Sequence, residues 1–548
     1  MMRRMMALVL AGLALLVGSA PAPVLALGKK TVMVPMSDGV KLATDVYLPD
    51  GTGQFPVVLA RTPYGRTTDF TGAVACMLGY VGVVQDMRGR FGSEGENLPF
   101  IGCGWEAPHD GADTVAWILT QDWCNGKVGT FGGSAGGITQ NLLAGAQPQG
   151  VQAQYIAVAA ANLYTDAGYI GGAFRKEQVE GWTTSHHFDP KAILMWKEHP
   201  SFDAFWQRFD STAKHAVMTS PAVHVGGWFD TFSQGTIDSF VGRQYHGAEG
   251  AKGKQKLVMG PWTHGGLGGG KPGELKFRDS RPRMQYDMFR WFDCLLKGQD
   301  NGILKEPAVA YYVMGDVDDP QAPGNKWRYA DAWPPPSTET PYYFGKGGTL
   351  GEAKPAAGPA FVEYTFDPAD PCPTLGGRNL NIKAGPMDQR PAEARKDVLS
   401  FTTEPLAAPL EVTGRLRAKV WVSASTADTD LSVRFADVYP DGRSMLMSEG
   451  MLRLRYRKSL SAPEPMKPGE PCEVDVDCWS TSLVVAKGHR IRVAVTSSNY
   501  PRFDLNPGTG KPWTDDAAAV KQTNRIYVDA AHPSRIVLPV VKVGGEAK

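Results

Sequence analysis

The chain has 548 residues, more than one hydrophobic core usually supports, so two or three domains are expected. Hydrophobic residues make up 43% and charged residues 21%, the balance of an ordinary soluble globular protein. The formal net charge is +1, so the composition gives no electrostatic support for binding nucleic acid or an anionic membrane.

The first 26 residues have the pattern of a secretory signal peptide. Arg3 and Arg4 precede an apolar run from Ala7 to Val17, and Val24-Leu25-Ala26 supplies small residues for cleavage. The run is short for a stable membrane span, and an uncleaved anchor is the alternative. We therefore expect an exported protein, periplasmic or extracellular, whose mature chain begins near Leu27.

The cysteines fit an oxidising compartment only loosely. They stand at positions 76, 103, 124, 294, 372, 472 and 478. The odd number leaves at least one free thiol, and the pairing cannot be deduced from the sequence. The spacings are not those of a zinc site, and we expect no metal.

Residues 27–149 alternate strand and helix patterns, which predicts the first part of a mostly parallel α/β sheet. A hairpin turning at Asp38-Gly39 is followed by buried-strand patterns at 55–60 and 80–84. Apolar residues at helical spacing predict a helix over 110–119.

The segment Val128–Gly137 predicts a strand, a sharp glycine turn and a helix beginning near Ile138. Gly132 and Gly136 stand at −2 and +2 of Ser134, the spacing of the G-x-S-x-G nucleophile elbow. Such a turn raises the serine oxygen above a sheet and points the N–H of Ala135 at a developing oxyanion. The alternative is a glycine-rich turn that holds an incidental serine.

Residues 150–217 change character, with many aromatic residues and little strand pattern. We interpret this segment as a helical cap over the catalytic edge of the sheet. Most of its aromatic side chains are expected to pack on one another, and a subset to line an apolar pocket.

The α/β pattern resumes over 218–305, with strands at 222–229 and 256–263 and a helix over 284–296. Asp230 and His264 each follow one of these strands. An isolated turn aspartate or loop histidine would carry little weight. The order Ser134, Asp230, His264 at three strand ends, however, is that of the catalytic triad in α/β-hydrolases.

Residues 306–548 have an all-β pattern, with period-two alternation at 416–422 and 490–495 and a turn at Tyr439-Pro440-Asp441-Gly442. Many short strands without a helical period predict a β-sandwich of the jelly-roll type. The predicted fold is therefore an α/β-hydrolase domain with a helical cap insertion, followed by a C-terminal jelly roll.

Several motifs resemble those of the cocaine-esterase-like (CocE/NonD) hydrolases and the related X-Pro dipeptidyl-peptidases. They include Arg61-Thr62-Pro63-Tyr64-Gly65, Gln85-Asp86-Met87-Arg88-Gly89, Gly227-Trp228-Phe229-Asp230, Gly260-Pro261-Trp262-Thr263-His264 and Ser498-Asn499-Tyr500-Pro501. The resemblance covers about residues 31–540. It implies the same three-part fold, and it implies that the Tyr64 hydroxyl joins the Ala135 N–H in the oxyanion hole. Many relatives have tyrosine where this chain has Ala135.

The function predicted from these features is hydrolysis of a small ester or amide through an acyl-enzyme, without cofactor or nucleic-acid partner. The alternatives within the class are an X-Pro dipeptidyl-peptidase and an α-amino-acid ester hydrolase or β-lactam acylase. Those need a carboxylate for the substrate amine, for which Asp166, Glu180 and Asp189 are candidates. An alternative outside the class is a carbohydrate-binding or adhesion protein. The substrate stays open, and a homo-oligomer is possible.

Overall fold

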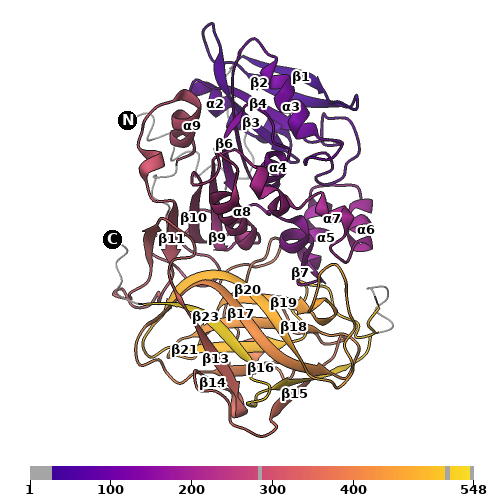
Figure 1. The fold of residues 1–548 in the computed structure, drawn as a ribbon, viewed down its shortest axis with the longest axis vertical. Helices are drawn as coiled ribbons and strands as arrows, with labels where there is room; N and C mark the ends of the chain where they lie inside the picture. Colours follow the sequence, from indigo (N-terminus) through magenta and orange to yellow (C-terminus); the bar gives the residue numbers. More distant parts are fainter. Residues whose placement is uncertain (1–27, 282–286, 512–518, 543–548) are drawn as a thin grey trace.

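The structure is a computed structural model that describes residues 28–281, 287–511 and 519–542. The predicted signal peptide lies outside the described residues. Two halves stack along the long axis of the molecule (Figure 1). The half drawn from indigo to magenta holds an α/β sheet, and the half drawn in orange and yellow is made of β-strands.

The α/β sheet has ten strands in the order β1-β2-β4-β3-β5-β6-β9-β10-β11-β12. All pairs from β4 to β11 are parallel, and the pairs at the two edges are antiparallel. Its strands are β1 (Lys29–Pro35), β2 (Lys41–Tyr47), β3 (Phe55–Thr62), β4 (Val81–Asp86), β5 (Cys124–Gly133), β6 (Val151–Ala157), β9 (Ala222–Phe229), β10 (Lys256–Thr263), β11 (Val309–Val313) and β12 (Lys326–Ala330).

This sheet extends beyond the predicted limits in two places. Strand β6 falls within the segment 150–217 that the sequence assigned to a helical cap, and it pairs with β5 and β9. Its polar Gln154 concealed the strand, since that side chain is fully buried and bonds to Thr130 and to the carbonyl of Gln140. Strands β11 and β12 lie past residue 306 but pair onto β10, so the C-terminal sheet begins later than predicted.

The helices of the α/β half are α2 (Thr71–Met77), α3 (Asp110–Leu119), α4 (Ala135–Gly145), α8 (Ser233–His246) and α9 (Met288–Lys297), with short helices η1 (Arg66–Thr68) and η5 (Ile303–Lys305). Three of these helices were predicted, α3 with its observed ends and α4 and α9 with shifted ends, whereas α2 and α8 were not predicted. Helix α4 begins at Ala135, three residues before the predicted start near Ile138. Of the helix predicted over 284–296, residues 284–286 lie outside the described residues. Helix α9 starts where the Asp287 carboxylate accepts two backbone N–H groups.

The insertion, defined here as residues 158–221 between β6 and β9, is made mainly of short helices. It contains η2 (Tyr164–Gly168), β7 (Tyr169–Ile170), β8 (Ala173–Phe174), α5 (Lys176–Ser185), α6 (Lys191–Glu198), α7 (Ala204–Gln207) and η3 (Ser211–Val217). Its aromatic rings pack on one another as expected, with Trp206 fully buried against Tyr164 and Tyr169.

The C-terminal half contains an eleven-stranded sheet in the order β15-β22-β17-β23-β13-β14-β16-β21-β18-β19, with β20 also paired to β17. An all-β half was predicted and is observed, and a jelly roll as its particular topology stays a prediction. The strands are β13 (Thr338–Gly345), β14 (Thr349–Gly351), β15 (Phe361–Phe366), β16 (Leu399–Thr402), β17 (Leu410–Ala424), β18 (Asp430–Val438), β19 (Ser444–Arg453), β20 (Cys472–Val485), β21 (Arg490–Thr496), β22 (Gln522–Tyr527) and β23 (Arg535–Val541). Short helices η6 (Lys346–Gly348), α10 (Arg390–Glu393) and η7 (Leu454–Tyr456) connect them.

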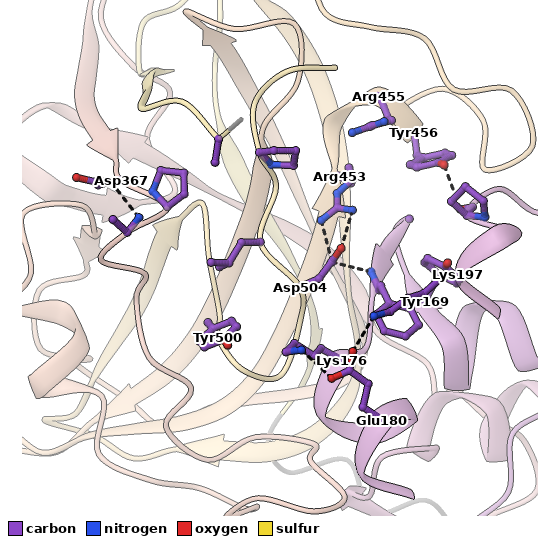
Figure 2. Close-up of a pocket in the computed structure, with 18 of the residues that line it drawn as sticks. Tyr169, Lys176, Glu180, Lys197, Asp367, Arg453, Arg455, Tyr456, Tyr500 and Asp504 are labelled. Atoms are coloured by element: carbon purple, nitrogen blue, oxygen red, sulfur yellow. Dashed lines mark hydrogen bonds and ion pairs between the residues drawn. The ribbon is translucent and has the colours of Figure 1, made fainter. Parts of the chain in front are cut away.

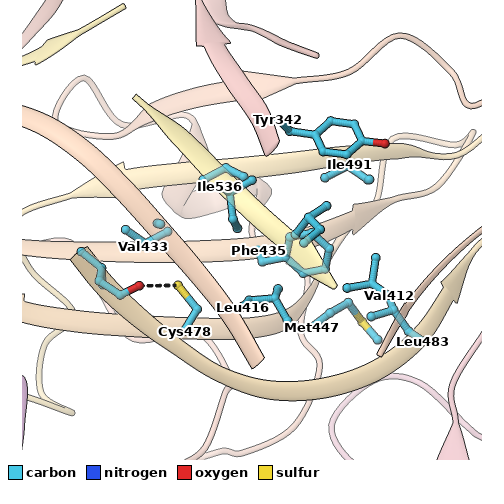
Figure 3. Packing of buried hydrophobic residues seen from close by; sticks show 14 of the residues in the cluster. Tyr342, Val412, Leu416, Val433, Phe435, Met447, Cys478, Leu483, Ile491 and Ile536 are labelled. Carbon is cyan, nitrogen blue, oxygen red and sulfur yellow. Dashed lines mark hydrogen bonds between the residues drawn. The ribbon is translucent and has the colours of Figure 1, made fainter. Parts of the chain in front are cut away.

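The largest hydrophobic core joins the two halves. It fills the C-terminal sheet with residues such as Leu416, Val433 and Phe435 (Figure 3), and it continues to Trp228 and Leu257 on β9 and β10. Strand alternation explains the inward set, because every second residue of β17 faces this core. The seven cysteines are all free thiols, and no helix of the described residues is long and apolar enough to cross a membrane.

Candidate active site

The predicted site residues gather at the carboxyl edge of the parallel sheet. Ser134 follows β5, Asp230 follows β9 and His264 follows β10, while Tyr64 lies in the turn after β3. Parallel strands present their carboxyl ends at one edge, where ligands bind in open α/β sheets. Four residues spread over 200 positions of the sequence thereby become neighbours, as the hydrogen bonds below show.

Ser134 sits on a strained turn that only its glycine neighbours permit. Its φ is 57° and its ψ is −126°, a backbone conformation that is costly for a residue with a side chain. A Cβ atom on Gly132 would stand 2.6 Å from the carbonyl oxygen of Gly136, and one on Gly137 would stand 2.7 Å from Cβ of Ala159. The strand and the helix therefore approach too closely for side chains at these two positions.

A chain of hydrogen bonds joins Ser134, His264 and Asp230. Nδ1 of His264 lies 2.6 Å from Oδ1 of Asp230, and Nε2 lies 2.9 Å from Oγ of Ser134. Because a carboxylate only accepts, the Nδ1–H donates to Asp230 and leaves Nε2 to accept the serine proton. Asp230 is fully buried, and its other oxygen accepts the N–H of Phe232 at 3.0 Å.

Two hydrogen-bond donors near Ser134, the Tyr64 hydroxyl and the Ala135 N–H, are the candidates for the oxyanion hole. The Tyr64 hydroxyl lies 3.3 Å from Oγ of Ser134, and the indole N–H of Trp182 donates to the Tyr64 oxygen at 3.2 Å. Since the indole nitrogen can only donate, the Tyr64 proton is free to point toward Ser134. Ala135 is the first residue of α4, so its N–H has no acceptor within the helix.

The pocket beside Ser134 is narrow and apolar, with a cavity volume of about 20 Å³. Its walls come from the α/β half, from the insertion and from the C-terminal half, which contributes Leu380. The lining residues are Phe100, Ser134, Ala135, Ile138, Ala167, Gln178, Val179, Trp182, Trp196, Phe232 and Leu380. Gln178 is already engaged, since it bonds to the carbonyl of Ala167 and accepts the Thr231 hydroxyl.

None of the three candidate carboxylates for a substrate amine lines this pocket. Asp166 is buried and accepts the N–H groups of Ala161 and Asn162, and burial raises its pKa to about 7. Glu180 forms ion pairs with Lys176 and Lys197, which lower its pKa despite partial burial. Asp189 lies near the surface and accepts the N–H of Lys191.

A second, larger cavity of about 510 Å³ lies between the insertion and the C-terminal sheet. Figure 2 shows Glu180 beside Lys176 on one side of it and Arg453 bonded to Asp504 on the other. Ser134, Asp230 and His264 are absent from its lining. Within the described residues, no group of three or more His, Cys, Asp or Glu side chains is arranged to hold a metal ion.

Several residues of the site gave no signal of their own in the sequence. Trp182 belonged to the aromatic-rich segment, but nothing set it apart from the other rings. Phe232 packs edge-on against the His264 ring at 5.4 Å, two residues after Asp230. Leu380 comes from a loop more than 100 residues after His264, and only the tertiary fold brings it to the pocket.

The parallel sheet with this cluster at its carboxyl edge is that of a serine hydrolase. Comparisons with known proteins give the same class. A family model described as X-Pro dipeptidyl-peptidase (S15 family) matches residues 38–192 and 184–266, and one for the X-Pro dipeptidyl-peptidase C-terminal non-catalytic domain matches 301–537.

One curated relative is the cocaine esterase of Rhodococcus sp. (strain MB1 Bresler), which is 35% identical over 93% of this chain and 98% of its own. The chain therefore belongs to the cocaine-esterase-like (CocE/NonD) hydrolases of the S15 family. Among solved structures, an aminopeptidase from a marine sediment Thaumarchaeota archaeon is 27% identical with a TM-score of 0.82, covering 96% of this chain and 98% of the other. An α-amino acid ester hydrolase is 28% identical with a TM-score of 0.79, at the same coverage.

Proposed function

We propose that this serine hydrolase cleaves esters of small, uncharged, apolar acyl groups through an acyl-enzyme on Ser134. The observation that carries the proposal is the apolar pocket, whose described lining contains no carboxylate, directly beside the bonded Ser134, His264 and Asp230. The cavity of about 20 Å³ holds little more than a water molecule. In this proposal its apolar side chains move apart to admit the acyl group, whose carbonyl carbon then lies next to Oγ of Ser134.

The proposed reaction has two stages, acylation and deacylation, and the same residues act in both. His264 takes the Ser134 proton as the oxygen attacks the carbonyl carbon, and returns it to the leaving alcohol. Asp230 accepts the Nδ1–H and stabilises the imidazolium that forms. The Tyr64 hydroxyl and the Ala135 N–H bind the oxyanion, and both are neutral donors before reaction. In deacylation, water gives a proton to His264 as its oxygen attacks the acyl carbon. The bond from the acyl carbon to Oγ of Ser134 then breaks, His264 returns the proton to Ser134, and the acid is released.

The insertion acts in this proposal as a cap. Val179, Trp182 and Trp196 come from it and form one side of the pocket, while Leu380 of the C-terminal half forms another wall. The Glu177 carboxylate on α5 accepts the N–H groups of Leu380 and Asn381 at 3.0 and 2.9 Å. These bonds fasten the two walls to each other.

A second candidate function is hydrolysis of substrates with a free α-amino group. The similarity to an α-amino acid ester hydrolase and to an aminopeptidase favours it. It requires a carboxylate at the pocket. Asp166 bonds inward to the backbone and Glu180 is paired with two lysines, so neither is free for a substrate amine.

The test is a turnover panel on purified wild type and Ser134→Ala. It holds acyl esters of increasing length, benzoyl esters, an α-amino-acyl ester with free and with acetylated amine, and a Gly-Pro anilide. We expect turnover of simple and aromatic esters, no dependence on a free amine, and a loss of about three orders of magnitude or more in Ser134→Ala. Strict dependence on the free amine would establish the second candidate, and full activity of Ser134→Ala would remove the mechanism.

We also propose that the protein is exported, on the signal-peptide pattern of residues 1–26. Expression of the full chain in a bacterial host, followed by N-terminal sequencing of the periplasmic or secreted product, should give a chain that starts near Leu27. Active protein that retains Met1 and stays with the cytoplasmic fraction would contradict export.

A further inference from the structure

Two buried arginines flank the turn that carries Asp230. Arg175 precedes α5 in the insertion, and Arg378 belongs to the loop 376–381 of the C-terminal half. Arg175 is 0% exposed and Arg378 is 1% exposed. Among the described residues, neither guanidinium forms an ion pair with a carboxylate. Burying a cation without a counter-ion is costly, so two such groups side by side call for a physical reason.

Arg378 holds the strand end before Asp230. Its Nε donates to the carbonyl oxygen of Trp228 at 2.9 Å, and its Nη2 donates to the carbonyl of Ser480 and to the hydroxyl of Ser448, both at 3.0 Å. The Arg378 side chain therefore reaches across the interface between the two halves, from the C-terminal half into the Asp230 turn.

Arg175 holds the other end of the same turn. It donates to the carbonyl oxygen of Thr231 at 3.2 Å and also to the Thr231 hydroxyl. The same guanidinium donates to the carbonyl of Asp166 and, at 3.3 Å, to the carbonyl of Arg378. Asp230 thus lies between two backbone positions, 228 and 231, that are each held by a buried cation.

The charges of Arg175, Arg378 and Asp230 influence one another. Burial lowers the pKa of both arginines to about 10. The charges that oppose this lowering most are Glu177 and Asp166 for Arg175, and Cys478 and Asp477 for Arg378, and Asp230 opposes it for both. Within the described part of the chain, the Asp230 carboxylate has only the imidazole of His264 and the N–H of Phe232 as hydrogen-bond partners. Because the effective dielectric constant is low around buried groups, charges several ångströms apart still interact without touching.

Other charged or titratable groups also face this region. They are Asp166 and Glu177 of the insertion, Asp238 on α8, Asp477 and Cys478 on β20, the bonded pair Glu449 and Arg502, and Tyr64 beside Ser134. Glu449 is already neutralised by Arg502, and Asp477 by Arg415. Arg175 and Arg378 are the cations whose hydrogen bonds reach the Asp230 turn.

We propose that Arg175 of the insertion and Arg378 of the C-terminal half are positioning residues that hold the Asp230 turn and supply positive charge near Asp230, so that these two parts of the chain set the pH range in which His264 acts as base. The proposal rests on the function proposed above. If either cation is removed, protonation of His264 is opposed by less positive charge, and the acid limb of kcat/KM moves to higher pH. A purely structural role would lower the activity without moving that limb.

The experiment measures the pH profile of kcat/KM for the full chain with a simple ester. We expect Arg378→Gln and Arg175→Gln each to raise the acid limb by about half a pH unit or more. Arg378→Lys and Arg175→Lys keep the charge and should keep the limb of the wild type while losing turnover. Arg243→Gln is the matched control, since Arg243 is fully buried without an ion pair but bonds to Gln154 and Asn141.

Two outcomes of the pH profiles would overturn the inference. An unmoved limb in folded, active glutamine variants, or an equal shift in Arg243→Gln, overturns the inference. The shift must also persist in an Asp166→Asn background, because burial raises the pKa of Asp166 to about 7 and its own titration could move the limb. If neither glutamine variant folds, Arg378→Met and Arg175→Met, which remove the charge at similar side-chain length, take their place, and an unmoved limb in them overturns the inference. Wild type that neither turns over esters nor reacts with a fluorophosphonate would instead refute the proposed function.

Discussion

The indole N–H of Trp182 donates a 3.2 Å hydrogen bond to the hydroxyl oxygen of Tyr64, whose oxygen lies 3.3 Å from Oγ of Ser134. A ring that lines the acyl pocket is thereby bonded to the group proposed to bind the oxyanion. Trp182 also stacks on Phe100, with ring centroids 5.6 Å apart and nearly parallel planes. Movement of the pocket wall and placement of the oxyanion donor are therefore linked.

Tyr64→Phe removes one of two proposed oxyanion donors and leaves the ring in place. We expect kcat to fall by about 100-fold to 1000-fold with little change in KM, because the lost bond forms fully only in the transition state. Steady-state kinetics with one ester checks this. A fall of less than about threefold would show that the Tyr64 hydroxyl does not bind the oxyanion.

Trp182→Phe keeps an aromatic wall but removes the donor to Tyr64. We expect a loss of about 3-fold to 30-fold in kcat, since Tyr64 stays present but is less well oriented. The double variant Trp182→Phe with Tyr64→Phe should lose no more than Tyr64→Phe alone. Additive losses in this double-mutant cycle would mean that Trp182 acts independently of Tyr64.

Gly132→Ala and Gly136→Ala form a matched pair at the nucleophile turn. A Cβ at 132 would stand 2.6 Å from the carbonyl oxygen of Gly136, whereas a Cβ at 136 would find its nearest atom, the Arg61 carbonyl oxygen, at an ordinary 3.5 Å. We expect Gly132→Ala to destabilise the fold by about 2–3 kcal/mol and Gly136→Ala to change stability by less than about 1 kcal/mol. Urea unfolding measures both, and equal effects would contradict the geometry.

Asp166 should make stability depend on pH. Its folded pKa of about 7 lies above the ordinary value of 3.8 because the carboxyl is buried. The folded protein then holds a proton that the unfolded chain releases, so this residue lowers stability as pH rises from about 4 to about 7, and the loss is complete above 7. Relative to wild type, Asp166→Asn should gain about 2–4 kcal/mol between pH 4 and pH 8. Unfolding free energies at the two pH values test this, and a constant difference would contradict it.

The sequence alone predicted those parts of the site whose chemistry is carried by local pattern. Ser134 was recognisable because glycines stand at −2 and +2 of it in the sequence, and Asp230 and His264 because each follows an apolar strand. Tyr64 was indicated only by the family resemblance. The structure brings all four together, and their catalytic roles stay proposals that the variants above test.

What the sequence could not predict depends on distant parts of the chain. Strand β6 was hidden because the buried amide Gln154 interrupts its apolar pattern and is satisfied by distant partners on β5, α4 and α8. Strands β11 and β12 continue the first sheet after the composition has already become all-β. Leu380 and Arg378 carry no local signal, since the site residues that they contact, Ser134 and Trp228 among them, lie about 150 to 250 positions earlier.

The fastening of Leu380 and Asn381 to Glu177 also has a consequence for the order in which activity can arise during folding. All the proposed reacting groups have emerged once the chain has been made as far as His264, yet the pocket at that stage still lacks its last wall. Leu380, which forms that wall, is made more than 100 residues later, and it reaches the pocket only when its loop in the C-terminal half bonds to Glu177 on α5. A chain interrupted in between would carry the reacting groups beside an open, unshaped surface, so selective hydrolysis would report that both halves have folded and met.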